Sequence, residues 1–212
     1  IMEDKYQKEL LELLLAPKNI DATLSILCNV QNIKQKIRRD FCDQLVSLAG
    51  EYGLEPREHY NDSLVTWDED YGWMIFLGKN KHQSQVGFVV GNFSRPNSKK
   101  GGMLYGLSII NGDYSNIEEL KNVFKIKSTD SDEQPLFRYE KDYHPVPESK
   151  GNLKKEFPFG YSFLYDEDRA MVKKWYDWDD VQTLADMRNG KMLDFMRTRF
   201  EILKKHGIID KL

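Results

Sequence analysis

Two short motifs, in which a lysine follows a glutamate by two positions, have the clearest potential for chemistry. They are Glu3-Asp4-Lys5 and Glu148-Ser149-Lys150. Carboxylates and a lysine around a divalent metal ion can activate water for phosphodiester cleavage. The first motif has no aspartate upstream, however, and the second lies in "HPVPESKG", whose prolines and glycine are typical of an exposed turn. We therefore predict no catalytic residue and no metal site, and keep a stand-alone metal-dependent nuclease built on Glu148 as an alternative.

Several clusters of basic side chains could contact a phosphate backbone. Lysine and arginine neutralise phosphates without reading the bases, so such contacts give affinity and no sequence specificity. Taken singly, each cluster is more typical of a solvated surface. The candidate nucleic-acid contacts are Lys36, Arg38, Arg39, Lys99, Lys100, Arg197 and Arg199.

Other chemistries that require a defined spacing are missing from the sequence. It has no phosphate-binding glycine loop and no G-x-S-x-G nucleophile elbow. Its four histidines are scattered, and neither cysteine has a close partner for zinc. Trp175 and Trp178 could stack on a base, but tryptophans at the start of a helix are more often core residues. The acidic run at 165–169 is interpreted as a helix cap rather than a cation site.

Length and composition indicate an ordinary soluble domain. The chain has 212 residues, of which 40% are hydrophobic, so it can bury a core without a metal or disulfide. The formal charge of −3 gives no overall attraction to nucleic acid or acidic lipid. Cys28 and Cys42 lie in helical patterns and favour free thiols in a reducing compartment. No apolar run approaches the ~20 residues of a membrane span, so we expect a cytoplasmic protein without a membrane partner.

Helical patterns occupy the first fifty residues. A leucine-rich run over 6–16 stops at Pro17, and a second helix is predicted from 20 to about Asn29, capped by Asn19 or Asp21. A third runs from 33 to 48 and ends at Gly50 and Gly53. Its apolar stripe is Ile33, Ile37, Phe41, Leu45 and Leu48, and its predicted outer face is Lys34, Lys36, Arg38 and Arg39.

Short aromatic and β-branched runs then predict antiparallel strands at 63–67, 72–78, 85–93 and 102–110. The run at 72–78 is apolar on both faces, which favours a strand covered on both sides, and the polar insert "KNKHQSQ" after it is interpreted as a hairpin loop. A short helix is expected at 116–124, and strands at 136–139 and 161–165. Helices return at 166–174, 180–189 and 191–206, the last with Met192, Phe195, Met196, Phe200 and Leu203 as its apolar face.

Helices, an antiparallel meander and helices again indicate an α+β fold. We predict a single domain over 1–212, helical at 6–50, β-rich at 63–165 and helical at 166–206.

The runs "LLELLLAPKNIDATLSILCNVQNIKQKIRRDFCDQL", "WMIFLG", "MLYGLSI" and "KKWYDWDDVQTLADMRNGKMLDFMRTRFEIL" cover most of the chain. Together they resemble the region that follows the catalytic core in bacterial PD-(D/E)XK-superfamily nucleases. In that family a core with an acidic pair and a lysine comes first, and helical, β-rich and tryptophan-containing helical segments follow.

The resemblance implies a non-catalytic C-terminal accessory domain that contributes DNA contact, sensing or assembly. The acidic core of the family is missing here, and residue 1 is Ile, so we expect a piece of a longer protein whose parent uses a divalent metal. The expected partners are DNA, through the basic clusters, and a catalytic domain or partner chain. A protein-interaction module without nucleic-acid binding is the alternative.

Overall fold

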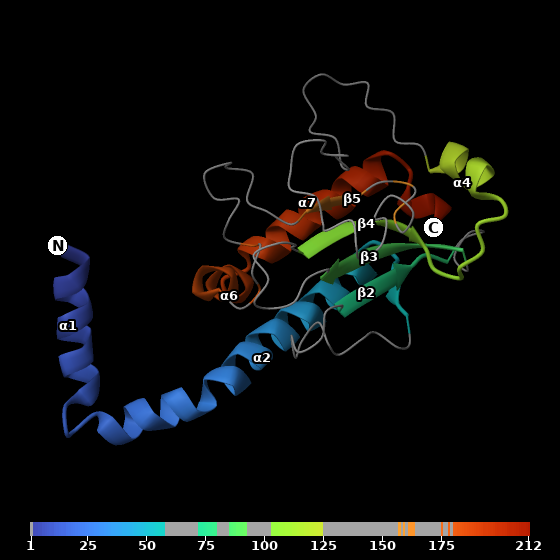
Figure 1. The fold of residues 1–212 in the computed structure, drawn as a ribbon. Coiled ribbons are helices and arrows are strands. Elements are labelled where there is room, and N and C mark those ends of the chain that lie inside the picture. The colour runs from blue at the N-terminus through green and yellow to red at the C-terminus, as the bar shows by residue number, and fades with distance from the viewer. Residues whose placement is uncertain are drawn as a thin grey trace.

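A computed structural model describes residues 2–57, 72–79, 85–92, 103–124, 157, 159, 161–163, 175, 178 and 180–212. Figure 1 shows a twisted sheet with helices on one side and a long helix that leads away from it. The α+β fold class is confirmed. The strands predicted at 63–67 and 136–139 and the helix predicted at 166–174 lie outside the described residues.

The N-terminal part consists of two helices, α1 (Met2–Leu15) and α2 (Ile20–Glu51). Helix α1 ends just before Pro17, as predicted. The predicted break near Asn29 is wrong, because α2 continues through it as one helix of 32 residues in all. The Asn29 side chain donates to the Ser25 carbonyl at 2.9 Å, and Asn32 donates to Asn29 Oδ1 at 3.3 Å. These asparagines bond within the helix, so they do not terminate it.

Glycine ends α2. Gly53 has φ +76°, a left-handed conformation that favours glycine, and its N–H donates to the Gly50 carbonyl at 3.0 Å. Leu54 N–H donates to the Ala49 carbonyl at 3.1 Å. The chain thereby reverses direction and enters the sheet directly after the helix.

The sheet is an antiparallel meander of five strands in sequence order. The strands are β1 (Glu55–Pro56), β2 (Gly72–Leu77), β3 (Val86–Asn92), β4 (Met103–Ile109) and β5 (Tyr161–Phe163). The predicted hairpin around the polar insert is confirmed, since β2 and β3 pair with Trp73 opposite Gly91. Strand β1 was not predicted, because it has two residues and one of them is a proline.

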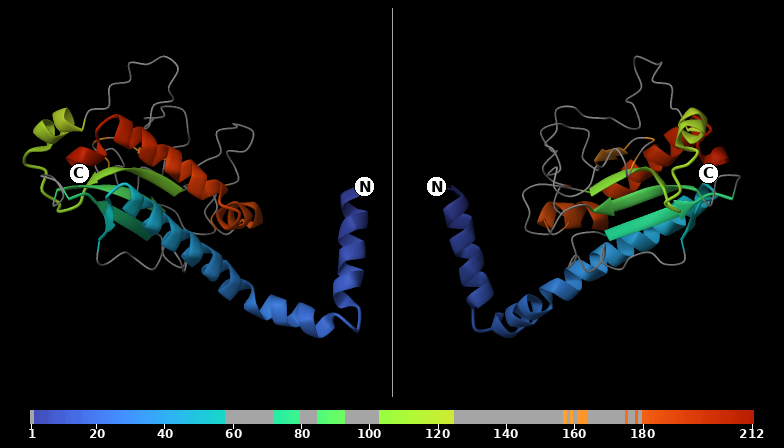
Figure 2. Two further views of the ribbon diagram at one scale, coloured as in Figure 1. Left: turned by 180° about the vertical axis from the view of Figure 1, so that it is seen from behind. Right: turned by 45° about the vertical axis from the view of Figure 1, so that its right-hand side comes forward.

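The remaining helices are α4 (Ile117–Val123), α6 (Val181–Arg188) and α7 (Lys191–Lys205), followed by the short helix η3 (Ile209–Lys211). They match the predicted segments at 116–124, 180–189 and 191–206. Asp180 accepts hydrogen bonds from the N–H groups of Gln182 and Thr183 and so caps α6. Figure 2 shows α7 and the C-terminal half of α2 on the same face of the sheet.

The core lies between this helical layer and the sheet. Phe200 of α7 is central, with its ring centroid 5.2 Å from Phe88, 6.3 Å from Phe76 and 5.4 Å from Tyr52. The predicted faces of the two long helices are confirmed where they reach the core, at Phe41, Leu45, Leu48, Met192, Met196, Phe200 and Leu203.

Asn19 occupies the N-cap position of α2, but its side chain makes no capping hydrogen bond.

The two halves of α2 should respond differently to the same substitution. Leu45 is 0% exposed and Leu24 is 51% exposed. Leu45→Ala should therefore lower the free energy of unfolding by about 2–5 kcal/mol, whereas Leu24→Ala should change it by less than about 0.5 kcal/mol. Urea unfolding of the isolated chain measures both. Equal losses for the two variants would contradict the placement of α2.

Candidate functional site

Among the described residues, the predicted basic contacts are divided between α2 and α7. Lys36 and Arg39 are exposed on α2, and Lys36 pairs with Asp40 at 3.0 Å. Arg197 lies on α7 and pairs with Glu51 at 2.6 Å. Lys99 and Lys100 lie outside the described residues, as do Glu148 and Lys150. DNA contact through these residues stays a prediction, but two of the three exposed cations have a carboxylate within hydrogen-bonding distance.

The expectation that Arg38 lies on an outer face is wrong, and Arg199 is buried as well. Arg38 is 1% exposed and Arg199 is 4% exposed. Arg38 precedes Phe41 and Leu45 by three and seven positions, which places it on the core side of α2. The guanidinium carbon of Arg199 lies 4.4 Å from the centroid of the Phe195 ring. Both arginines pack their aliphatic stems inside the fold, so neither is accessible to a phosphate backbone.

The two tryptophans are core residues, as the sequence favoured. Trp175 Nε1 donates to Asp186 at 2.9 Å, and Asp186 also accepts a hydrogen bond from Gln182 at 3.0 Å. The Trp178 ring meets Phe41 edge-on, with centroids 5.7 Å apart. Trp175 thus packs beside α6 and Trp178 beside α2, and both are too buried to be available for a base.

The charged cluster where α2 ends beside α7 is balanced. Glu51 accepts a hydrogen bond from Arg197, which raises the pKa of that guanidinium above its ordinary value. Burial, assisted by Glu201, raises the pKa of the Tyr52 phenol, while Arg197 opposes the rise. Opposite charges thus alternate in this cluster, and it does not form a positive patch.

The unusual surface is an arm formed by α1 and residues 20–33 of α2. Both views in Figure 2 show it leading away from the sheet and from α6 and α7. The described residues include ten large hydrophobic side chains that are exposed, and all but Val181 lie on the arm. Those on the arm are Tyr6, Leu10, Leu11, Leu13, Leu15, Leu24, Ile26, Leu27 and Ile33.

Hydrogen bonds hold the junction between the two helices of the arm. Asn19 Nδ2 donates to the Leu13 carbonyl at 2.8 Å, and Thr23 Oγ1 donates to the Leu14 carbonyl at 2.8 Å. They satisfy carbonyl groups that the end of a helix leaves unpaired. Helix α1 stands at a steep angle to α2 (Figure 1), and Leu24 and Leu27 of α2 are exposed.

The apolar face of the arm continues into the core. Leu27, Val30 and Ile37 precede Phe41 and Leu45 at helical spacing, so all five lie on one side of α2. Phe41 and Leu45 are buried, Ile37 is partly buried, and Leu27 is 62% exposed. The side of α2 that the domain covers at its C-terminal end is therefore uncovered at its N-terminal end, and Lys34 lies between the two parts.

Sequence reasoning missed the arm because a leucine-rich helix is normally a core helix. A signal was present: five leucines in six positions, 10–15, leave the C-terminal half of α1 with almost no polar face.

Cys28 also lies on the arm and is exposed, whereas Cys42 is buried, and neither forms a disulfide.

Within the described part of the chain, no three His, Cys, Asp or Glu side chains are grouped to hold a metal ion. None of the helices among those residues is long and apolar enough to cross a membrane. No protein-family model, curated protein or solved structure gives a significant match to this chain.

The isolated chain should bind the dye 8-anilinonaphthalene-1-sulfonate through the arm, because the dye becomes fluorescent on apolar surfaces. Replacing Leu10, Leu24 and Leu27 by serine should reduce this fluorescence at least about twofold and leave the unfolding midpoint unchanged, since all three side chains are exposed. Val181→Ser, at an exposed residue outside the arm, is the control. Undiminished fluorescence of the triple variant would contradict the assignment.

Proposed function

We propose that this chain is a non-catalytic assembly domain that binds a partner surface through its arm. The supporting observation is the cluster of exposed apolar side chains on the arm, which includes Leu24 and Leu27 of α2. Clustered exposed apolar side chains are typical of a protein interface, whereas scattered ones are not. A partner seated there would extend the existing core beside α6.

The stability of α1 supports the same proposal. Helix α1 has 14 residues, and helices of this length are marginal in water unless a tertiary contact stabilises them. Its exposed leucines make no such contact with the sheet or with α6 and α7. Burial of one leucine side chain contributes about 1.5–3 kcal/mol, so a partner that covers several of them would stabilise both the helix and the complex.

The charge of α1 constrains the partner. Residues 2–15 contain four acidic and two basic side chains, so the apolar groove that receives α1 should have a basic rim. We take the partner to be the catalytic core of a PD-(D/E)XK-like nuclease encoded together with this domain, as the resemblance implies. The domain would position that core and contribute no catalytic residue of its own.

The reactivity of the Cys28 thiol shows whether the arm is exposed or covered. It should react rapidly with a maleimide in the isolated chain, while buried Cys42 stays unlabelled. In the assembly with the nuclease core, Cys28 labelling should slow at least about tenfold, because the interface excludes the reagent.

The double variant Leu24→Glu/Leu27→Glu should lose the protection of Cys28, because it places two carboxylates in the interface. The control Val181→Glu, at an exposed residue of α6, should retain it. Equal labelling rates for free and assembled wild-type protein would overturn the proposed interface.

A cleavage assay separates the assembly role from an enzymatic one. The isolated chain should not cleave DNA with Mg²⁺ or Mn²⁺, whereas the assembly with the nuclease core should. Robust cleavage by the isolated chain that Glu148→Ala or Lys150→Ala abolishes would instead establish the alternative, a stand-alone metal-dependent nuclease.

A further inference from the structure

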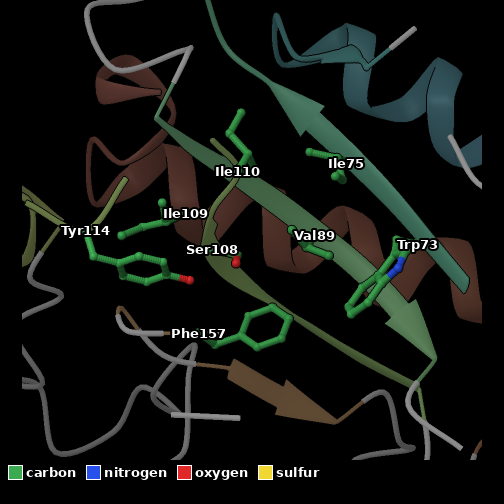
Figure 3. A pocket seen from close by; sticks show the side chains of 8 residues that line it. All are labelled: Trp73, Ile75, Val89, Ser108, Ile109, Ile110, Tyr114 and Phe157. Atoms are coloured by element: carbon green, nitrogen blue, oxygen red, sulfur yellow. The ribbon is translucent and has the colours of Figure 1, made fainter. Parts of the chain in front are cut away.

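The sheet has a second face, turned away from α2 and α7, and this face is hollowed. Figure 3 looks onto it, with the helices behind the strands. A pocket of about 300 Å³ opens there. It is lined by Trp73, Ile75, Val89, Ser108, Ile109, Ile110, Tyr114 and Phe157.

Glycines in β3 allow large neighbouring side chains to form the pocket. A Cβ atom at Gly87 would lie 3.0 Å from Cγ2 of both Ile75 and Ile110, and one at Gly91 would lie 3.0 Å from the Trp73 ring. Such distances are tighter than ordinary van der Waals contact, so these side chains occupy space that a residue with a Cβ would fill. Side chains from β2 and from the end of β4 consequently lean over β3 around Val89.

The burial pattern of β2 indicates that this second face of the sheet is not fully covered. Met74 and Phe76 are buried on the helix side of β2, whereas Trp73, Ile75 and Leu77 on the opposite side are half-buried. The expectation that β2 is covered on both faces is therefore only half correct. Side chains of intermediate exposure beside a pocket can gain contacts when a ligand enters it.

The lining combines rings with hydroxyl groups. Trp73, Tyr114 and Phe157 surround an aliphatic floor, and Figure 3 shows the Tyr114 hydroxyl directed towards Ser108 and the open space. A hydroxyl can donate one hydrogen bond and accept two. None of the eight described lining residues carries a charge.

We infer that this pocket binds a small neutral aromatic molecule with a single hydrogen-bonding substituent. Its volume is at the lower end for small-molecule sites, which suits one ring or two. The ring would pack among Trp73, Val89 and Phe157, and the substituent would meet Ser108 and Tyr114. A neutral ligand is favoured, because the described lining residues offer no counter-charge to a charged one. The inference is independent of the arm.

The test uses 4-fluorophenol as the probe, followed by ¹⁹F NMR while the isolated chain is titrated. The wild-type chain should bind it saturably. Ser108→Ala should weaken binding about fivefold, as expected for one hydrogen bond. 4-Fluorobenzoate, which has a similar ring and a charge, should bind at least about tenfold more weakly than the phenol.

Two matched variants locate the binding. Val89→Phe should abolish it by filling the pocket, and Val181→Phe, the same exchange at an exposed residue of α6, should leave it unchanged. If circular dichroism shows that Val89→Phe fails to fold, Ser108→Ala and the charged analogue decide the question. The inference is overturned by the absence of saturable binding, by equal affinity for phenol and benzoate, or by unchanged affinity of a folded Val89→Phe variant.

Discussion

The structure depends on one long helix, α2, which carries apolar side chains on the same side at its buried end and at its exposed end. Residues 20–51 form one helix, and hydrophobic residues recur on one side of it from Leu27 to Leu48, interrupted by Lys34. The C-terminal half of this face packs against α6, α7 and the sheet through Phe41 and Leu45. Because an α-helix is stiff, the N-terminal half of α2 extends into solvent in a direction that the packed C-terminal half fixes. Core packing and the exposed arm are thus two ends of one element.

The body of the domain fixes α2 from several directions. Trp178 packs edge-on against Phe41 of α2. The Trp175 indole donates a hydrogen bond to Asp186 of α6. Gly53 turns the chain from α2 into the sheet, and Arg197 pairs with Glu51 at the end of the helix. These contacts anchor the arm to a packed core. A partner that binds the arm would accordingly gain a fixed orientation relative to the sheet and its pocket.

The sequence predicted most of this body because its periodicities are strong. The stripe at Phe41, Leu45 and Leu48 and the run at 72–78 each have one dominant interpretation, and the structure agrees with both elements. The false break near Asn29 arose because asparagine is common just after the last turn of a helix. Here the Asn29 side chain bonds to a carbonyl within the helix instead.

Exposure was harder to predict than secondary structure. Arg38 was assigned to the outer face by its charge, although its spacing to Phe41 and Leu45 places it on the core side. The leucines of α1 were assigned to an apolar helix correctly, but no local pattern reveals whether a partner surface lies against them. The pocket depends on Gly87 and Gly91 meeting Ile75 and Trp73 across strands, which is a tertiary relation that one segment does not contain.

The most direct test of the assembly role is hydrogen exchange of the backbone amides in the isolated chain and in the assembly with the nuclease core. If a partner covers the arm, amides at 6–33 will exchange rapidly in the isolated chain and become protected in the assembly. Amides at 41–48, which the core already covers, will change little. Arm amides that exchange equally fast in both states would contradict the account.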